Sequence, residues 1–227
     1  MKTPAVVLCL GLQAAAATLI AAEAPAPCCP PPDPAKAAPC CPAPAPEVAR
    51  KDAPCCTELA AARPLSAKSL YQLDVTWTND AGQAVSLASF RGRPLTLAMI
   101  FASCEYACPV LVDDIRRMRA LLPEEVRANT PVVLVSFDTV RDTPAALRAF
   151  RERMKLDGAW ILLRGEAAPV QELAMLLGVK FKQDARGQFA HSNLFTVLNT
   201  EGEIVHQHAG LMGDVSSPAK VIASLGR

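Results

Sequence analysis

The apolar residues between about position 65 and the C-terminus switch repeatedly between two spacings. Short continuous apolar runs such as Val132–Val135 predict buried strands, because a central strand covered by helices is apolar on both faces. Apolar residues three and four positions apart predict amphipathic helices, as at Leu111, Ile115, Met118 and Leu122. The pattern therefore predicts one domain over residues 64–227, with a central sheet covered by helices.

The order of the predicted elements indicates the fold class. A hairpin precedes them, with strands Leu73–Thr78 and Ala84–Leu87 joined by a turn at Asn79–Gly82. The predicted strands are Leu95–Phe101, Val132–Phe137, Trp160–Leu163, Leu194–Asn199 and Ile204–Ala209, with a hairpin-like insert at Lys180–Phe189. The predicted helices are Pro109–Leu122, Thr143–Met154, Ala168–Leu177 and Ser217–Leu225. Strand–helix alternation followed by an antiparallel pair and a last helix is typical of an α/β, thioredoxin-like fold.

The first 22 residues have the pattern of an export signal. Lys2 is followed by an apolar run from Ala5 to Ala22, and the small residues at its end suit cleavage just after them. The segment is predicted to be a signal peptide or a short uncleaved anchor. We therefore expect the protein to be exported, either periplasmic or anchored to the outer face of the inner membrane.

Residues 23–63, called the stalk below, are dominated by Ala and Pro and show no apolar periodicity, so we expect a disordered tether. The stalk repeats Ala-Pro-Cys-Cys three times, which places its cysteines in adjacent pairs: Cys28 and Cys29, Cys40 and Cys41, Cys55 and Cys56. One interpretation is that these cysteines form disulfides between pairs, or that they arose by neutral sequence drift in a linker that tolerates substitution. The other is accessory capture of a soft metal such as Cu(I), since sulfur ligands select such ions.

Charge argues against one class of partner. The chain has 23 basic and 22 acidic residues and a net charge of +1, and no basic stripe with interleaved aromatic residues occurs. A role in nucleic-acid binding therefore has little support.

The strongest chemical signal lies where a predicted strand meets a predicted helix. Cys104 and Cys108 are separated by three residues, and Pro109 suits the first position of a helix. That placement predicts Cys108 at the helix N-cap, where the dipole and the unpaired N–H groups favour a thiolate. Two such thiols can close a disulfide or hold a soft metal ion.

Together with three further stretches, this segment resembles the Sco (SenC-type) copper chaperones of cytochrome oxidase assembly. Cys104-x-x-x-Cys108-Pro109 is similar to the metal site of that family, and Asp138-x-x-x-Asp142-Thr-Pro to its acidic loop. His191-Ser192, ahead of a strand and turn, is similar to the segment that carries the third ligand. The segment Ser89–Pro94, which precedes the first central strand, is also similar to the corresponding segment of that family.

The resemblance implies that Cys104, Cys108 and His191 bind Cu(I), with an open position that would accept Cu(II). It implies two partners, the copper-receiving subunit of a membrane cytochrome oxidase and a thiol reductant. The family often has an acidic residue before the histidine, and here that residue is Ala190, so Asn193 or a backbone carbonyl would have to orient the imidazole. The alternative from another class is an exported thiol–disulfide oxidoreductase on the same fold.

Four other polar residues have competing interpretations. Asp138 and Asp142 are candidates for partner docking, although Asp142 would also serve as the N-cap of the next helix. His206 and His208 lie two apart on one face of a predicted strand, where they would bind metal together or simply lie exposed at an edge.

Overall fold

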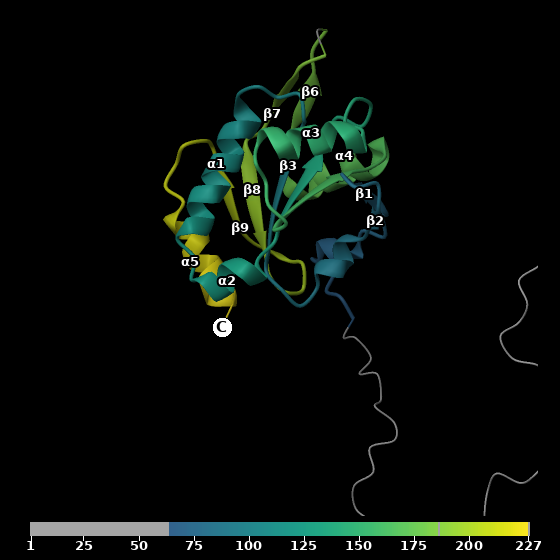
Figure 1. Ribbon diagram of the computed structural model, residues 1–227. Coiled ribbons are helices and arrows are strands. Elements are labelled where there is room, and N and C mark those ends of the chain that lie inside the picture. The colour runs from purple at the N-terminus through teal and green to yellow at the C-terminus, as the bar shows by residue number, and fades with distance from the viewer. Residues whose placement is uncertain (1–63, 186, 227) are drawn as a thin grey trace, which may run out of the picture. The chain divides into compact units, whose positions relative to one another are not determined.

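The computed structural model describes residues 64–185 and 187–226. Their main sheet has seven strands in the order β2-β1-β5-β4-β3-β8-β9 (Figure 1). The strands are β1 (Trp77–Asn79), β2 (Ala84–Val85), β3 (Leu95–Ile100), β4 (Val132–Ser136), β5 (Trp160–Arg164), β8 (Leu194–Leu198) and β9 (Ile204–Ala209). The central strands β3, β4 and β5 are parallel, whereas β8 and β9 run antiparallel beside β3. This arrangement is the predicted α/β, thioredoxin-like fold.

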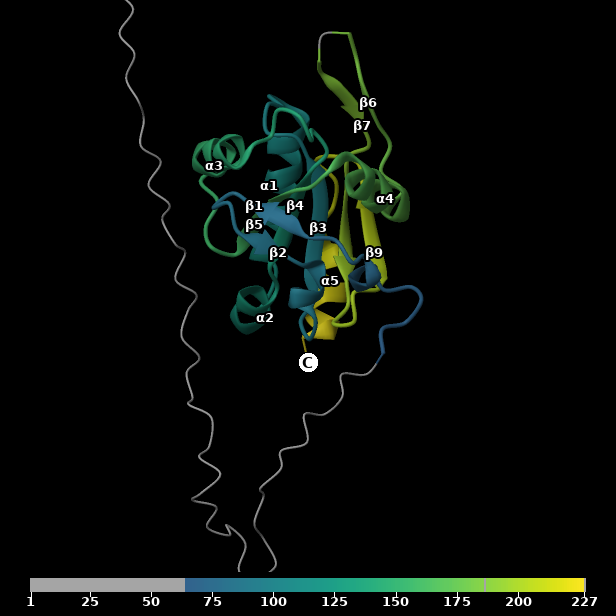
Figure 2. The same ribbon diagram turned by 90° about the vertical axis from the view of Figure 1, so that its right-hand side faces the viewer.

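Every residue of β3 and β4 is buried, which explains why their sequences are apolar on both faces. The connecting helices are α1 (Ala107–Ala120), α2 (Glu124–Asn129), α3 (Pro144–Arg153), α4 (Ala167–Leu177) and α5 (Ser216–Leu225). Helices α1 and α3 cover one face and α4 the other (Figure 2). Right-handed crossovers place α1 and α3 on the same face, because β3-α1-β4 and β4-α3-β5 both step in the same direction along the sheet. Helix α5 packs beside α1.

The N-terminal hairpin is present but shorter than predicted. Its first strand, β1, begins only at Trp77, and β1 pairs with β2 in an antiparallel register. A 3-10 helix at Leu70–Gln72 precedes it, and a second one at Leu87–Phe90 contains Leu87, which was predicted to end the second strand. Helix α2 was not predicted, because its six residues bury none of their side chains and so leave no apolar period to detect. The other boundaries agree within about two residues.

A second hairpin stands outside the main sheet. Strands β6 (Phe181–Gln183) and β7 (Phe189–His191) pair only with each other among the described strands, and the hairpin projects beyond the end of the main sheet (Figure 1). Helix α4 ends just before it at Gly178, whose φ of 70° is the left-handed conformation that closes many helices. The hairpin therefore carries its last residue, His191, to the end of the sheet where β3 stops.

The predictions for residues 1–63, the signal segment and the stalk, lie outside the described residues. In the part of the chain that the structure describes, none of the helices has the length and apolar character needed to cross a membrane.

Candidate metal centre

The two cysteines lie on either side of the junction between β3 and α1. Cys104 sits in the loop after β3, where its N–H donates to the Phe101 carbonyl at 3.1 Å, and it is only 7% exposed. Cys108 lies in the first turn of α1 and is fully buried. Its N–H donates to the Sγ of Cys104 over 3.3 Å.

This geometry corrects the predicted helix start. The N-cap is Tyr106, not Cys108, so Cys108 is the second helical residue and Pro109 the third. Pro109 still breaks no hydrogen bond, because the first four N–H groups of a helix have no partner within it. The sulfur that accepts a hydrogen bond from the helix N-terminus is that of Cys104. The thiolate predicted at Cys108 is therefore stabilised at Cys104 instead.

The pKa values of the two thiols move in opposite directions. The hydrogen bond from the Cys108 thiol is the main cause that lowers the pKa of Cys104, to about 3, with help from His191 and two backbone N–H groups and against the effect of burial. The same hydrogen bond, seen from its donor, raises the pKa of Cys108, and burial raises it further. The pair therefore shares one proton, held by Cys108, and Cys104 carries the negative charge.

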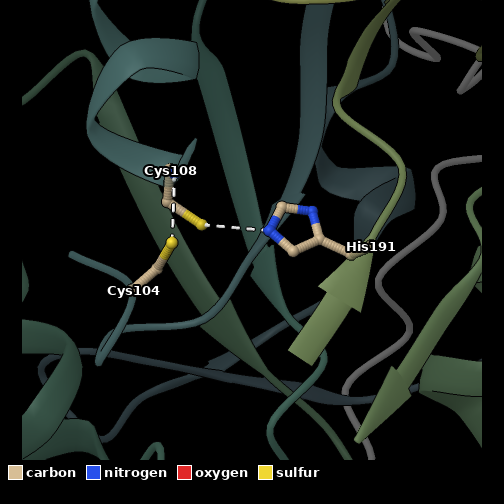
Figure 3. A group of neighbouring side chains, drawn as sticks. All are labelled: Cys104, Cys108 and His191. Atoms are coloured by element: carbon tan, nitrogen blue, oxygen red, sulfur yellow. Dashed lines mark hydrogen bonds between the residues drawn. The ribbon is translucent and has the colours of Figure 1, made fainter. Parts of the chain in front are cut away.

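His191 reaches the cysteines from the end of β7 (Figure 3). Its Nδ1 lies 3.1 Å from the Ser192 carbonyl, which can only accept, so Nδ1 carries the proton. A backbone carbonyl thus orients the imidazole, one of the two substitutes predicted because Ala190 is not acidic. The other ring nitrogen, Nε2, faces the two cysteines and lies 4.0 Å from the Sγ of Cys108. Burial lowers the pKa of His191, but hydrogen bonds to Cys104 and to the Ser192 carbonyl raise it by more, to a net value above the ordinary one.

The ligand atoms of Cys104, Cys108 and His191 all lie within 4.8 Å of one another. Metal–sulfur bonds of about 2.3 Å spread in a trigonal plane would place ligand atoms about 4 Å apart, so small movements suffice to close them around an ion. Two thiolates and one imidazole are soft and intermediate ligands that suit Cu(I). The site is thus fit for copper in its donor set and in its spacing.

Aromatic rings surround the histidine. The rings of Phe101 and Phe137 lie 5.7 and 5.1 Å from the His191 ring. Phe181 and Phe189 of the hairpin continue the cluster by packing on Phe137 at 4.9 and 5.1 Å. We did not predict this cluster from the sequence. The available signal was that Phe101 and Phe137 each directly follow a neighbouring parallel strand, which places them at the same edge of the sheet.

The acidic loop does not match its predicted use. Asp138 and Asp142 are each 2% exposed. Asp142 accepts hydrogen bonds from the Ala102 N–H at 2.7 Å and the Ser136 hydroxyl at 2.5 Å, while Asp138 pairs with Arg141. The N-cap of α3 is Thr143, not Asp142. Docking of a partner by these carboxylates stays a prediction, and their burial does not favour it.

The remaining candidates lie apart from the cluster. His206 and His208 are half-buried on β9, and the His208 ring stacks on Phe195 with centroids 5.0 Å apart. Among the described residues, one cluster of three or more possible metal ligands is present, and it consists of Cys104, Cys108 and His191. The six cysteines of the stalk lie outside the described range.

Comparison with known proteins agrees with this site. The SCO1/SenC family model matches residues 64–226. A relative from Stutzerimonas stutzeri, named as a copper-binding protein, is 27% identical over 158 residues, which are 68% of this chain and 72% of the relative.

Solved structures extend the similarity to the fold. ScoI of Bradyrhizobium japonicum with copper bound superposes with a TM-score of 0.55 at 20% identity, over 66% of this chain and 96% of that one. BsSco, a member of the Sco family of cytochrome c oxidase assembly proteins in which a disulfide switch was identified, superposes with a TM-score of 0.57 at 22% identity, over 66% and 90% of the two chains. At these identities the superpositions support the fold alone.

Proposed function

Because the chain belongs to the SCO1/SenC family, we propose that it carries copper and delivers it to the copper-receiving subunit of a membrane cytochrome oxidase. The observation that carries this proposal is the convergence of Cys104, Cys108 and His191 at one end of the sheet. The three residues come from two separate segments, the β3–α1 junction and the β6–β7 hairpin. They supply the two sulfurs and one nitrogen that a Cu(I) ion needs.

The surroundings of the site suit a carrier that passes its copper to another protein. A surface cavity of about 500 Å³ opens beside the site and is lined by Ser103, Cys104, Glu105, Pro109, Arg153 and Met154. A receiving ligand can approach the Cys104 sulfur through this opening, whereas Cys108 is fully buried. Three protein ligands also leave room for an incoming one, so copper can pass to the target by exchange of ligands.

The proposed setting is outside the cytoplasm, because of the apolar segment Ala5–Ala22 at the start of the chain. In an oxidising compartment the two thiols are liable to form a disulfide, which removes both sulfurs from the ligand set. An external dithiol would restore them: it loses two electrons and two protons to become a disulfide, and Cys104 and Cys108 gain both. This is the role proposed for the thiol reductant.

A second candidate function is reduction of the cysteines of the target. The unequal thiols favour it, because Cys104 is held as a thiolate and Cys108 keeps a proton. A thiolate at Cys104 could attack a target disulfide, and Cys108 could then resolve the mixed disulfide. Copper content separates the candidates, since a carrier binds about one copper per chain at this site and a plain oxidoreductase binds none.

The test measures Cu(I) affinity by competition with a chelator, in full-length protein whose six stalk cysteines are replaced by serine. Replacement of Cys104 or Cys108 by Ser should lower the affinity by at least a hundredfold, since a hydroxyl is a hard, poorly ionised ligand. Replacement of His191 by Ala should weaken binding less, because both thiolates remain. Unchanged affinity in the double Cys104→Ser, Cys108→Ser variant would refute the proposed site.

A further inference from the structure

The loop between β4 and α3, residues 137–143, contacts both halves of the metal centre. At its end, the Asp142 carboxylate accepts the N–H of Ala102 in the segment that leads to Cys104. At its middle, the Arg141 guanidinium lies over the Phe189 ring, 5.6 Å from its centroid. Phe189 is in β7, two residues before His191. One loop thus holds the cysteine segment with one side chain and the histidine hairpin with another.

The direction of the Arg141 side chain is set by Asp138. The Asp138 carboxylate accepts the backbone N–H of Arg141 at 3.0 Å and forms an ion pair with its guanidinium. Asp138 is 2% exposed, so its carboxylate has little freedom to move. The guanidinium also reaches the hairpin turn, where its Nη1 lies 3.1 Å from the place that a Cβ on Gly187 would occupy. The ion pair therefore holds the Arg141 guanidinium against the hairpin.

The hairpin needs such support. It consists of two three-residue strands, and within residues 64–185 and 187–226 these strands pair with each other and not with the main sheet. A two-stranded hairpin of this size is marginally stable in water on its own. Its position depends on the phenylalanine cluster, on hydrogen bonds between Lys180 and Ser192 at its base, and on Arg141.

We propose that Asp138 and Arg141 are positioning residues that hold the β6–β7 hairpin against the cysteine loop, so that His191 lies within reach of Cys104 and Cys108. The proposal rests on the proposed function, because it assigns a role to residues around the same site. It also gives the buried Asp138 a use other than docking a partner. Arg141 touches neither copper nor cysteine in this scheme and acts only through the hairpin.

The expected size of the effect follows from the contact. Loss of a cation–π interaction lowers the equilibrium constant for docking of the hairpin roughly threefold to tenfold. Because a hairpin of this size is marginally stable by itself, the docked fraction, and with it the copper affinity, is expected to fall by a similar factor. Since the two thiolates bind copper without the hairpin, the loss cannot exceed that caused by removing His191 itself. In a protein that lacks His191, removal of Arg141 should have no further effect on copper affinity.

The experiment is a double-mutant cycle in the background with six serines in the stalk. Arg141→Ala should lower Cu(I) affinity roughly threefold to tenfold when His191 is present, and leave it unchanged in the His191→Ala protein. Arg141→Lys keeps the charge but not the planar guanidinium, so its copper affinity should lie between those of the wild type and Arg141→Ala. The matched control is Arg116→Ala, because Arg116 also pairs with an aspartate three residues away, at 2.8 Å, and lies 6.0 Å from the Trp160 ring centroid. It should not change copper affinity.

A second measurement needs no copper. Hydrogen exchange of the backbone amides in β6 and β7 of the reduced, metal-free protein should be about threefold to tenfold faster in Arg141→Ala and unchanged in Arg116→Ala. Equal losses of copper affinity with and without His191, or no change in hairpin exchange, would overturn the positioning role. If the proposed copper site itself failed its cysteine test, the exchange result would still decide whether Arg141 holds the hairpin.

Discussion

Two cysteines four positions apart have unequal chemistry here because one donates a hydrogen bond to the other. Cys104 accepts from the Cys108 thiol and from the N-terminal turn of α1, which stabilises its thiolate. Cys108 is enclosed and keeps its proton. An incoming thiol or copper ligand therefore meets an anionic sulfur at Cys104 first.

This inequality predicts a flat pH profile for alkylation of reduced Cys104. With a pKa of about 3, Cys104 is already fully thiolate at pH 5, so its rate should stay constant between pH 5 and 8. A free cysteine of pKa about 8.5 gains roughly tenfold in rate per pH unit over the same range. Peptide mapping by mass spectrometry after short pulses measures each cysteine, and the denatured protein is the control. A Cys104 rate that rises like the control would contradict the hydrogen-bonded thiolate.

Asp142 offers a test of pH-dependent stability. Burial raises its pKa in the folded state, in spite of its hydrogen bonds from Ser136 and Ala102. A carboxyl whose folded pKa is raised binds its proton more tightly when folded, so its contribution to stability is present at low pH and is lost as pH rises through the folded pKa.

Asp142→Asn should therefore gain stability relative to the wild type as pH rises from about 4, the unfolded value. The asparagine carbonyl can replace Oδ2, which accepts both hydrogen bonds of the carboxylate. Urea denaturation under reducing conditions between pH 4 and 8 gives the difference in the free energy of unfolding. A difference that does not change with pH would show that Asp142 titrates alike in both states.

At the scale of elements, a single residue closes α4 before the β6–β7 hairpin begins. Gly178 closes α4 with a φ of 70°, and a Cβ there would meet no atom within 4 Å. Gly178→Ala should thus cost about 1 kcal/mol in the free energy of unfolding, from backbone strain alone. Gly158→Ala is the matched control, because its Cβ would also meet nothing and its φ is not left-handed. Equal effects of the two substitutions in chemical denaturation would argue against the strain.

At the scale of the whole molecule, the stalk carries six of the nine cysteines of the chain, whereas the residues that the structure describes carry two. If the Ala-Pro-Cys-Cys pairs capture Cu(I), the reduced full-length protein should bind more than one copper. Replacement of the six cysteines by serine should return it to about one, with slower loading of Cys104 and Cys108. Copper analysis and stopped-flow loading under strict reduction measure both. Equal stoichiometry and rates would leave the stalk cysteines with no part in copper capture.

Local pattern was sufficient to predict most of the fold. The buried runs in β3 and β4 and the apolar stripe of α1 are visible in the sequence, because period and burial are properties of neighbouring residues. Helix α2 buries none of its side chains, so its sequence shows no apolar period from which it could be predicted. The spacing of Cys104 and Cys108 and the family-like segment at His191 likewise identified the three members of the metal cluster.

Tertiary structure alone decided how those residues work. Which sulfur is the thiolate depends on the residue at which α1 begins. Whether Asp138 is accessible to a partner depends on its burial. The contact of Arg141 with Phe189 joins two segments that are distant in the chain. Sequence by itself determined the elements and the ligand types, since these follow from local spacing and side-chain chemistry. Protonation, burial and the position of the hairpin arise from contacts between distant segments, which exist only after the chain has folded.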